Sequence, residues 1–155
     1  MIKNPLVSVI MNCLNGERYL RQSIESLMKQ TYPNWECIFW DNNSTDNSKK
    51  IFLSYNDNRL KYFHSKDRVT LYKARNLALE KTSGEFISFL DTDDYWTKEK
   101  ITKQVNFFMN NSTIDIVYSN YYIKNEKWSK KSKIAYQDKE ILDGYLFDKL
   151  MNKFF

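Results

Sequence analysis

The sequence predicts an α/β fold, in which helices cover both faces of a mostly parallel central sheet. Short apolar runs of strand length alternate with segments of helical periodicity, and this pairing repeats four times along the chain. The segments that follow three of these runs are rich in asparagine and aspartate. Since ligands of such sheets bind beyond the carboxyl ends of the strands, the pattern indicates a binding site there.

The strands are predicted from runs of apolar and β-branched residues that polar residues bound on either side. A run of this kind is typical of a strand that is covered on both faces. The expected strands span residues 6–11, 35–40, 60–63, 86–90 and 114–122.

The helices are predicted from apolar residues that recur at three- and four-residue spacing. Three expected helices span residues 17–30, 70–81 and 98–109. A shorter helix carries Ile51, Phe52 and Tyr55, and Ser44 or Thr45 is expected to cap its N-terminus.

The composition suits one soluble domain. The 155 residues carry a formal net charge of +5, which fits an anionic ligand or an acidic membrane surface. No basic stripe with interleaved aromatic residues indicates a nucleic-acid partner. Cys13 and Cys37 lie in apolar runs, as buried thiols of a reducing compartment do, and the single histidine, His64, argues against a zinc site. We find neither a leader pattern nor an apolar segment of ~20 residues, so a cytoplasmic location is expected.

Three carboxylates follow the fourth predicted strand within four positions. Asp91, Asp93 and Asp94 would repel one another unless a cation lay between them. Mg²⁺ and Mn²⁺ prefer carboxylate oxygens together with water and ligand phosphates. The alternative is the N-terminus of a helix that starts near Thr97, where acidic residues are ordinary. The metal site is favoured, because one helix end does not need three carboxylates.

Polar residues also follow the first two predicted strands. Asn12 and Asn15 can reach a base or a ribose, and the Asp41–Ser44 segment suits hydrogen bonds to a planar base. Both segments are equally consistent with turns and helix caps. Arg75 can grip phosphate oxygens with its planar guanidinium, whereas Lys73 fits a solvated helix face at least as well.

The stretch VSVIMNCLNGERYLRQSIESLMKQTYPNWECIFWDNNSTDNS resembles the opening of the family 2 glycosyltransferases, which are inverting enzymes with the GT-A fold. The family opening has a strand, an Asn-containing turn, a helix, Gln-Thr-Tyr, a second strand and the pattern D-D/N-x-S-x-D. GEFISFLDTDDYW is similar to the metal-binding D-x-D region of the family, and ARNLALEKTSGEF to the helix before it. The resemblance covers residues 5–125 and implies a Rossmann-like, three-layer GT-A domain.

The resemblance also implies the residues of a nucleotide-sugar site. Asp93 is expected to bind Mg²⁺ or Mn²⁺, with Asp91 beside the ribose or supporting the metal. The metal would act as a Lewis acid that stabilises the leaving nucleoside diphosphate. The residues expected to contact the nucleotide sugar are Asn12, Leu14, Asn15, Asp41, Asn42, Asn43, Arg75, Asp91 and Thr92.

The sequence departs from the family pattern in two places. Many members carry a second aspartate where this chain has Asn42, so an amide replaces a carboxylate at the base. The carboxylate that activates the acceptor would fall beyond Phe155, so the catalytic base stays unknown. We therefore expect residues 1–125 to be the nucleotide-sugar-binding domain. Residues 126–155 are expected to be a basic loop and an amphipathic helix that begin the acceptor side.

The expected activity is metal-dependent, inverting transfer of a sugar, with a UDP-sugar as the preferred donor. The acceptor would be a glycan or a lipid-linked glycan of a bacterial surface polysaccharide or lipopolysaccharide. The alternative is a non-catalytic module that binds a nucleotide sugar. A nucleotidyltransferase would share the acidic site, but it needs a glycine- and basic-rich triphosphate loop that the sequence lacks. The apolar pair Phe154 and Phe155 suggests self-association or contact with the inner face of a membrane.

Overall fold

The computed structural model describes residues 4–123 and 133–134. The chain divides into two compact units, Met1–Thr113 and Ile114–Phe155. Each unit is described by itself. The predicted boundary at residue 125 stays a prediction, and most of the predicted segment 126–155 lies outside the described residues.

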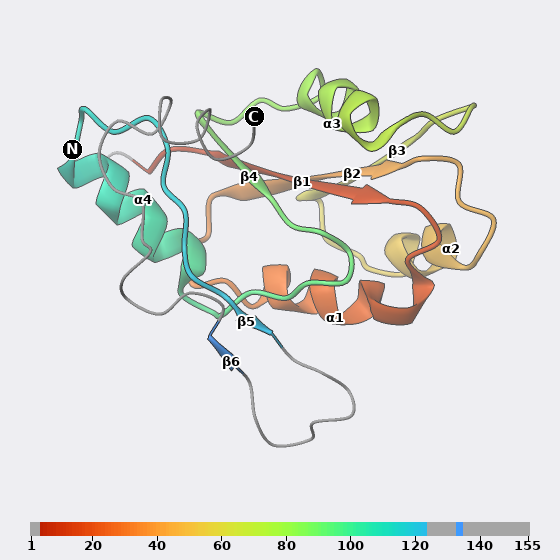
Figure 1. Cartoon of the computed structure of the whole chain (residues 1–155), viewed down its shortest axis with the longest axis horizontal. Helices are drawn as coiled ribbons and strands as arrows, with labels where there is room; N and C mark the ends of the chain where they lie inside the picture. Colours follow the sequence, from red (N-terminus) through yellow and green to blue (C-terminus); the bar gives the residue numbers. More distant parts are fainter. Residues whose placement is uncertain (1–3, 124–132, 135–155) are drawn as a thin grey trace. The chain divides into compact units, whose positions relative to one another are not determined.

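The first unit is built on a four-stranded parallel sheet (Figure 1). Its strands are β1 (Val7–Cys13), β2 (Trp35–Asp41), β3 (Leu60–His64) and β4 (Phe86–Phe89). They lie in the order β3-β2-β1-β4, and every neighbouring pair is parallel. The predicted parallel sheet is confirmed for this unit, and each strand ends within about two residues of the expected position.

Helices cover both faces of this sheet and make three layers (Figure 1). The helices α1 (Glu17–Met28), α2 (Ser48–Leu53) and α4 (Lys100–Asn110) pack on one face. The helix α3 (Leu71–Leu79) packs on the other face. This is the layered α/β arrangement that the strand–helix alternation predicts.

The core is divided in two by the alternation of side chains along the strands. Val9 and Phe39 belong to the cluster under α1, α2 and α4, whereas Ile10 and Trp40 belong to the cluster under α3. In the larger cluster Phe39 stacks on Phe52 with ring centroids 4.2 Å apart. Burial of each large apolar side chain contributes about 1.5–3 kcal/mol to the free energy of folding, so the apolar clusters on both faces stabilise the sheet.

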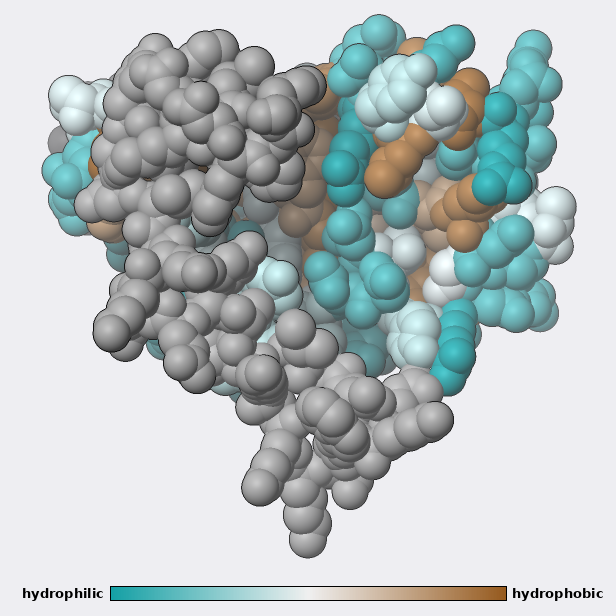
Figure 2. Space-filling view, viewed as in Figure 1, coloured by the Kyte–Doolittle hydropathy of each residue, from teal (hydrophilic) through white to brown (hydrophobic). Residues whose placement is uncertain are grey.

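The strand β4 lies at one end of the sheet and keeps two large apolar side chains exposed. They are Ile87 and Phe89, which alternate with the half-buried residues of the strand. On the face seen in Figure 2, hydrophilic residues surround smaller hydrophobic patches in the described part. No helix among the described residues has the length and apolar character that crossing a membrane requires.

The prediction of a strand over residues 114–122 is wrong. Residues 114–121 form no strand, and Ile116 is 70% exposed. The strand β5 (Tyr122–Ile123) is short and pairs antiparallel with β6 (Lys133–Ile134) in a separate sheet. The apolar and aromatic residues of this segment favour a strand, but they do not reveal whether a neighbouring strand exists to pair with it.

The predicted cap of the second helix is also wrong. The N-cap of α2 is Asn47, while Ser44 and Thr45 lie further upstream. The side chain that reaches the first turn of α2 is Asp46, whose Oδ1 accepts the N–H of Ser48 at 2.9 Å. The misplaced cap arises because Ser44 has another partner in space, as described below.

Candidate functional site

The polar segments that follow β1, β2 and β4 lie where the parallel strands end, which we call the carboxyl edge of the sheet. Cys13 at the end of β1 is level with Asp41 at the end of β2. On the other side of β1, the N–H of Leu90 donates to the carbonyl oxygen of Ile10 at 3.0 Å, one residue before Asp91. Because the strands are parallel, all three polar segments therefore lie at the carboxyl edge.

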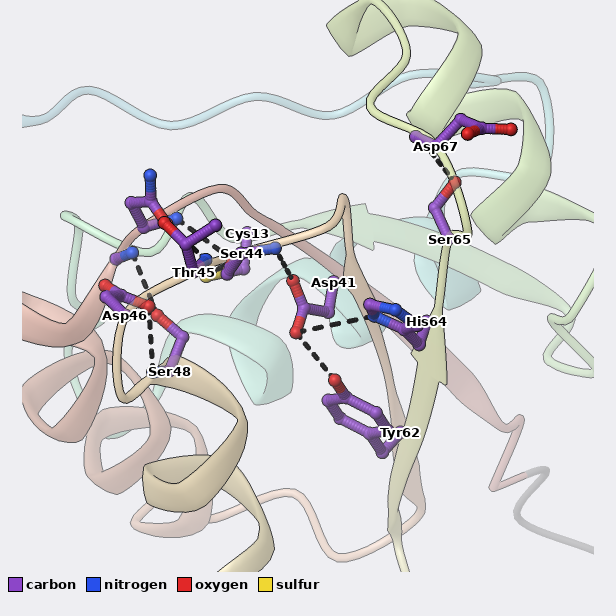
Figure 3. Close-up of polar contacts among 12 residues, drawn as sticks. Cys13, Asp41, Ser44, Thr45, Asp46, Ser48, Tyr62, His64, Ser65 and Asp67 are labelled. Carbon is purple, nitrogen blue, oxygen red and sulfur yellow. Dashed lines mark hydrogen bonds and ion pairs between the residues drawn. The ribbon is translucent and has the colours of Figure 1, made fainter.

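The loops after β1 and β2 are joined by hydrogen bonds (Figure 3). Main-chain N–H groups of Asn15 and Gly16 donate to the hydroxyl oxygens of Ser44 and Ser48, each at 3.0 Å. The N–H of Glu17 donates to Oδ2 of Asp46 at 2.9 Å. These side chains come from the D-N-N-S-T-D-N-S stretch, and they satisfy donors at the start of α1 that the helix itself leaves unpaired.

Side chains of Asn15 and Glu17 in turn accept hydrogen bonds from main-chain N–H groups of the loop after β2. Oδ1 of Asn15 accepts the N–H of Thr45 at 2.8 Å, and Oε2 of Glu17 accepts the N–H of Asn47 at 2.9 Å. Asn15 and Asn43 have φ angles of 56° and 66°, a left-handed conformation that asparagine tolerates better than most residues. The turn interpretation of these segments is therefore correct, whether or not they also bind a ligand.

The hydrogen bonds between these two loops lower the pKa of the Asp46 carboxyl group. Burial raises its pKa, but hydrogen bonds from Ser48 and from the N–H of Glu17 outweigh burial and hold the pKa below its ordinary value. A carboxylate at the N-termini of α1 and α2 is also favoured by both helix dipoles.

Asp41 is almost completely buried and uses both carboxylate oxygens within the protein. Its Oδ1 accepts the N–H of Ser44 at 2.8 Å, and its Oδ2 accepts the hydroxyl of Tyr62 at 2.6 Å. Nδ1 of His64 lies 3.9 Å from the same Oδ2 (Figure 3). Burial, together with the hydrogen bond to Asp41, raises the pKa of Tyr62, so this phenol stays protonated as the donor.

Asn42 is also buried, and its carboxamide makes two bonds to one residue. Nδ2 donates to the carbonyl oxygen of Val69 at 2.8 Å, and Oδ1 accepts the N–H of Val69 at 3.0 Å. Asn43, the next predicted base contact, is half-buried.

Four buried side-chain donors have no hydrogen-bond partner among the described residues: Nδ2 of Asn12, Nε1 of Trp35, Nε1 of Trp40 and Nε of Arg75. Trp35 and Trp40 belong to the apolar clusters, which leaves Asn12 and Arg75 as the polar side chains with such a donor at the carboxyl edge. Nη2 of Arg75 is occupied by Oδ1 of Asp91 at 3.0 Å. Buried donors are normally paired, so unpaired donors at a strand end indicate a place where a ligand oxygen binds. Leu14, in the loop that Asn12 begins, is half-buried.

Residues 91–96, the acidic loop after β4, are held by hydrogen bonds to side chains of α1. The hydroxyl of Ser23 donates to the carbonyl oxygens of Thr92, at 2.8 Å, and Asp94. Ser26 Oγ accepts the N–H of Trp96 at 3.0 Å. The main chain of the loop is therefore fixed, which leaves the carboxylates of this segment available to a ligand.

The side chain of Gln30 hydrogen-bonds to the segment before α4 and to the first turn of that helix. Its Oε1 accepts the N–H of Ile101 at 3.0 Å, and its Nε2 donates to the carbonyl oxygen of Thr97 at 2.7 Å. Sequence reasoning missed Ser23, Ser26 and Gln30. The signal was two serines among the apolar residues on the buried side of α1 and a glutamine just beyond its end, because buried polar groups need partners.

Gly16 allows the loop after β1 to approach the acidic loop closely. A Cβ atom at this position would lie 3.0 Å from Thr92 Oγ1 and 3.0 Å from Cys13 Sγ. A larger residue would require the side chains of Cys13 and Thr92 to shift by a few tenths of an ångström. Cys13 is buried and free, as predicted, and burial raises the pKa of its thiol.

The acidic loop does not serve as the N-terminus of α4. That helix begins at Lys100 with Glu99 as its N-cap, several residues beyond Asp94. Partial burial raises the pKa of Asp94, and the negative charges of Asp93 and Asp91 raise it further. A cation bound here would offset this repulsion, so the carboxylates fit a hard divalent ion.

The acidic loop offers fewer than a full set of metal ligands. The described residues contain no group of three or more His, Cys, Asp or Glu side chains placed to hold a metal ion. Ions such as Mg²⁺ commonly take one or two carboxylates and complete their coordination with substrate phosphates and water. The carboxylates of Asp91 and Asp93 fit this second kind of site.

The sequence of the chain matches a known family. The model for "Glycosyl transferase family 2" matches residues 8–154. The chain belongs to this family. The resemblance seen in the sequence is thereby confirmed.

Curated relatives of this chain include bacterial glycosyltransferases. The chain is 39% identical over 136 residues to the Escherichia coli protein WfgD, described as "UDP-Glc:alpha-D-GlcNAc-diphosphoundecaprenol beta-1,3-glucosyltransferase". It is 38% identical over 110 residues to TuaG of Bacillus subtilis, a "putative teichuronic acid biosynthesis glycosyltransferase". The matches cover 84% and 70% of this chain, but only 53% and 44% of the relatives.

Solved structures of glycosyltransferases share the fold. Staphylococcus aureus TarS 1–349, crystallised with UDP-GlcNAc, matches 68% of this chain with a TM-score of 0.66 and 34% identity. The match covers 32% of the TarS chain. The mannosyltransferase PcManGT of Pyrobaculum calidifontis, in complex with GDP-Man and Mn²⁺, has a TM-score of 0.63 at 23% identity and covers 69% of this chain and 33% of its own. The GT-A fold is therefore confirmed.

Proposed function

We propose that the carboxyl edge of this sheet binds a nucleotide-diphosphate sugar, and that the protein transfers the sugar to a glycan or lipid-linked acceptor of a bacterial surface polysaccharide. The observation that carries the proposal is the pair of unpaired buried donors, on Asn12 and Arg75, beside a carboxylate loop whose main chain is fixed. A nucleoside diphosphate supplies the oxygens that such donors need, from its base and ribose as well as from its phosphates, and a divalent cation joins the phosphate oxygens to carboxylates.

The relatives support a nucleotide sugar as the donor. WfgD is described as using UDP-Glc, TarS was crystallised with UDP-GlcNAc, and PcManGT with GDP-Man. We favour a UDP-sugar for this chain, because WfgD and TarS are the more similar of these proteins. The acceptor class follows from WfgD and TuaG in the same way.

The proposed roles follow from the position of each residue. Asn12 and Leu14 border the base and ribose, together with the loop that contains Asp41, Asn42 and Asn43. Asn15 acts mainly by joining these two loops, since its Oδ1 accepts the N–H of Thr45.

We assign binding of the diphosphate to the acidic loop and α3. Arg75 would bind phosphate oxygens through Nε while it holds Asp91 through Nη2. Asp93 and Asp91 would hold Mg²⁺ or Mn²⁺, and Thr92 lies between them against Gly16. The metal, when bound, stabilises the charge of the departing nucleoside diphosphate.

The mechanism we propose is direct, inverting displacement. A carboxylate base would remove the proton of the acceptor hydroxyl as that oxygen bonds to the anomeric carbon and the nucleoside diphosphate departs. We assign that base to none of the described residues. The alternative of a module that binds without catalysing is favoured by no specific observation.

A binding panel tests the proposal. Thermal shift and calorimetry are measured with UDP-Glc, UDP-GlcNAc, GDP-Man and a dTDP-sugar, each with and without Mn²⁺. We expect Mn²⁺-dependent binding of one nucleotide class, with the Mn²⁺-dependent part abolished in Asp93→Ala. Glu25→Gln removes an exposed carboxylate of α1 that pairs with Lys29, and this variant should bind as the wild type does. Binding of no nucleotide by the wild type would reject the proposal, and hydrolysis or transfer of the sugar separates an enzyme from a binding module.

A further inference from the structure

Asn42 lies just beyond β2, and its side chain hydrogen-bonds to the main chain of Val69 in the loop before α3. Both ends of the carboxamide bond to Val69, at 2.8 Å and 3.0 Å. Asn42 is 6% exposed, so water does not compete effectively for these bonds. The amide pairs with Val69 as a second peptide group would.

Val69 is the last residue before the N-cap of α3. The N-cap, Thr70, makes no side-chain hydrogen bond to the helix. Within α3, Arg75 donates to Asp91 at 3.0 Å. Asn42 therefore fixes the end of the helix that brings Arg75 to the acidic loop.

The loop from residue 65 to residue 70 is held at its other end by β2. The N–H of Ser65 donates to the carbonyl oxygen of Asp41 at 2.9 Å, and the Ser65 hydroxyl donates to the carbonyl oxygen of Asp67 at 2.6 Å. Lys66, Asp67 and Arg68, between the two attachments, are exposed. The bonds to Asn42 thus determine where the far end of this loop lies.

The chemistry at Val69 requires an amide. An aspartate in place of Asn42 would still accept the N–H of Val69, but it would have no proton to donate to the Val69 carbonyl. It would instead place a negative oxygen beside that carbonyl oxygen, which would lose its partner. This is a local reason for asparagine where the family pattern often has aspartate.

We propose that Asn42 is a positioning residue: its carboxamide holds Val69, and through Val69 the wall that the 65–70 loop and α3 present to the nucleotide, and it does not select the base. The identity of the bound molecule rests on the proposed function. The bonds to Val69 can be tested without any nucleotide.

Hydrogen exchange tests the bonds directly. Asn42→Ser should speed exchange of the Val69 amide about tenfold or more, Asn42→Asp, which keeps an acceptor for that amide, should speed it less, and both should leave exchange in β1 unchanged. The matched control is Asn34→Asp, which removes an equivalent bond from Nδ2 to the carbonyl oxygen of Asn4 (2.7 Å) in the connection before β2. It should leave residues 66–71 as in the wild type. Unchanged exchange there in both Asn42 variants would overturn the inference.

Nucleotide affinity tests the positioning role. UDP and CDP differ at the hydrogen-bonding edge of the base, and their Kd values are measured well below the melting temperature. Both should weaken in the Asn42 variants by the same factor, about tenfold, so that their ratio changes less than about twofold. A ratio that changes more than about fivefold would show that Asn42 selects the base. Unchanged Kd values with a lower melting temperature would show a purely structural role, and either result overturns the inference. If the wild type binds neither nucleotide, the proposed function fails, while the exchange measurement still decides the bonds to Val69.

Discussion

The two ends of the central sheet use similar polar residues in opposite ways. At the amino-terminal end, Glu36 on β2 is 4% exposed and fully bonded: Ser8 Oγ, Ser83 N–H and hydroxyl, and Lys61 Nζ all donate to it. Ser8 Oγ in turn accepts the N–H of Gly84 at 2.8 Å. At the carboxyl end, donors of the polar side chains Asn12 and Arg75 have no partner among the described residues, whereas at the amino-terminal end the donor without a partner is Nε1 of Trp35, inside the apolar cluster.

This contrast separates stability from binding. A buried carboxylate whose bonds are all satisfied joins β1, β2 and the start of β4 and needs no ligand. Unpaired donors beside exposed carboxylates lower stability unless something binds to them. Substitutions at the amino-terminal end should therefore reduce stability and spare binding. Substitutions of the exposed carboxylates at the carboxyl end should weaken binding and spare stability.

The largest effect is expected from Glu36→Gln. With its oxygen in the position of Oε1 the new amide keeps the bonds from Ser8 and Ser83, but its NH2 group faces Lys61 Nζ, so the ion pair is lost and the remaining bonds go to a neutral acceptor. We expect a loss of about 2–4 kcal/mol in the free energy of unfolding, measured with urea at pH 7. The exposed Glu25→Gln should cost less than ~0.5 kcal/mol. Similar losses in both variants would contradict the central role of Glu36.

The same network predicts a dependence on pH. Burial raises the pKa of Glu36, but the bonds from Lys61, Ser8 and Ser83 outweigh burial and lower the pKa to about 2. Because the folded-state pKa lies below the ordinary value of 4.5, the stabilisation is complete above pH 4.5 and is lost as the pH falls toward 2. The stability difference between wild type and Glu36→Gln should shrink by about 3 kcal/mol over that window. A difference that stays constant from pH 5 to pH 2.5 would contradict the network.

A smaller effect is expected from Ser23→Ala at the carboxyl end. The carbonyl oxygens of Thr92 and Asp94 would lose their donor, which should cost about 1–2 kcal/mol and loosen the acidic loop. Mn²⁺-dependent binding of the nucleotide sugar, followed by calorimetry, should weaken about three- to tenfold. Ser54→Ala, which removes a similar hydroxyl bond at the end of α2, is the control and should keep full affinity. Equal affinities in the two variants would show that Ser23 does not support the site.

The sequence predicts the sheet and helices of the first unit well, because periodicity is a local property. The alternation along β1 and the spacing of Leu20, Ile24 and Leu27 in α1 each report which side is buried. The strand predicted over residues 114–122 failed because pairing depends on a neighbour, and a neighbour is not a local property.

The site is predictable only in part, for the same reason. The sequence brings attention to Asn12, Arg75 and Asp93, since their types suit a nucleotide diphosphate and a metal. It cannot show that Ser44 and Asp46 bond to residues at and just before the start of α1, or that Asn42 bonds to Val69, because these partners lie 27–29 residues away along the chain. Only the fold distinguishes residues that hold the loops from those left with unpaired groups.

The most direct test compares Asp93→Asn with Glu36→Gln in two measurements, unfolding by urea and calorimetric binding of a UDP-sugar with Mn²⁺ at a temperature where both variants are folded. We predict that Asp93→Asn keeps wild-type stability and loses the Mn²⁺-dependent affinity at least tenfold. Glu36→Gln should lose stability and keep wild-type affinity. Full affinity in Asp93→Asn, or a loss of affinity in folded Glu36→Gln that matches its loss of stability, would contradict the separation of the two ends of the sheet.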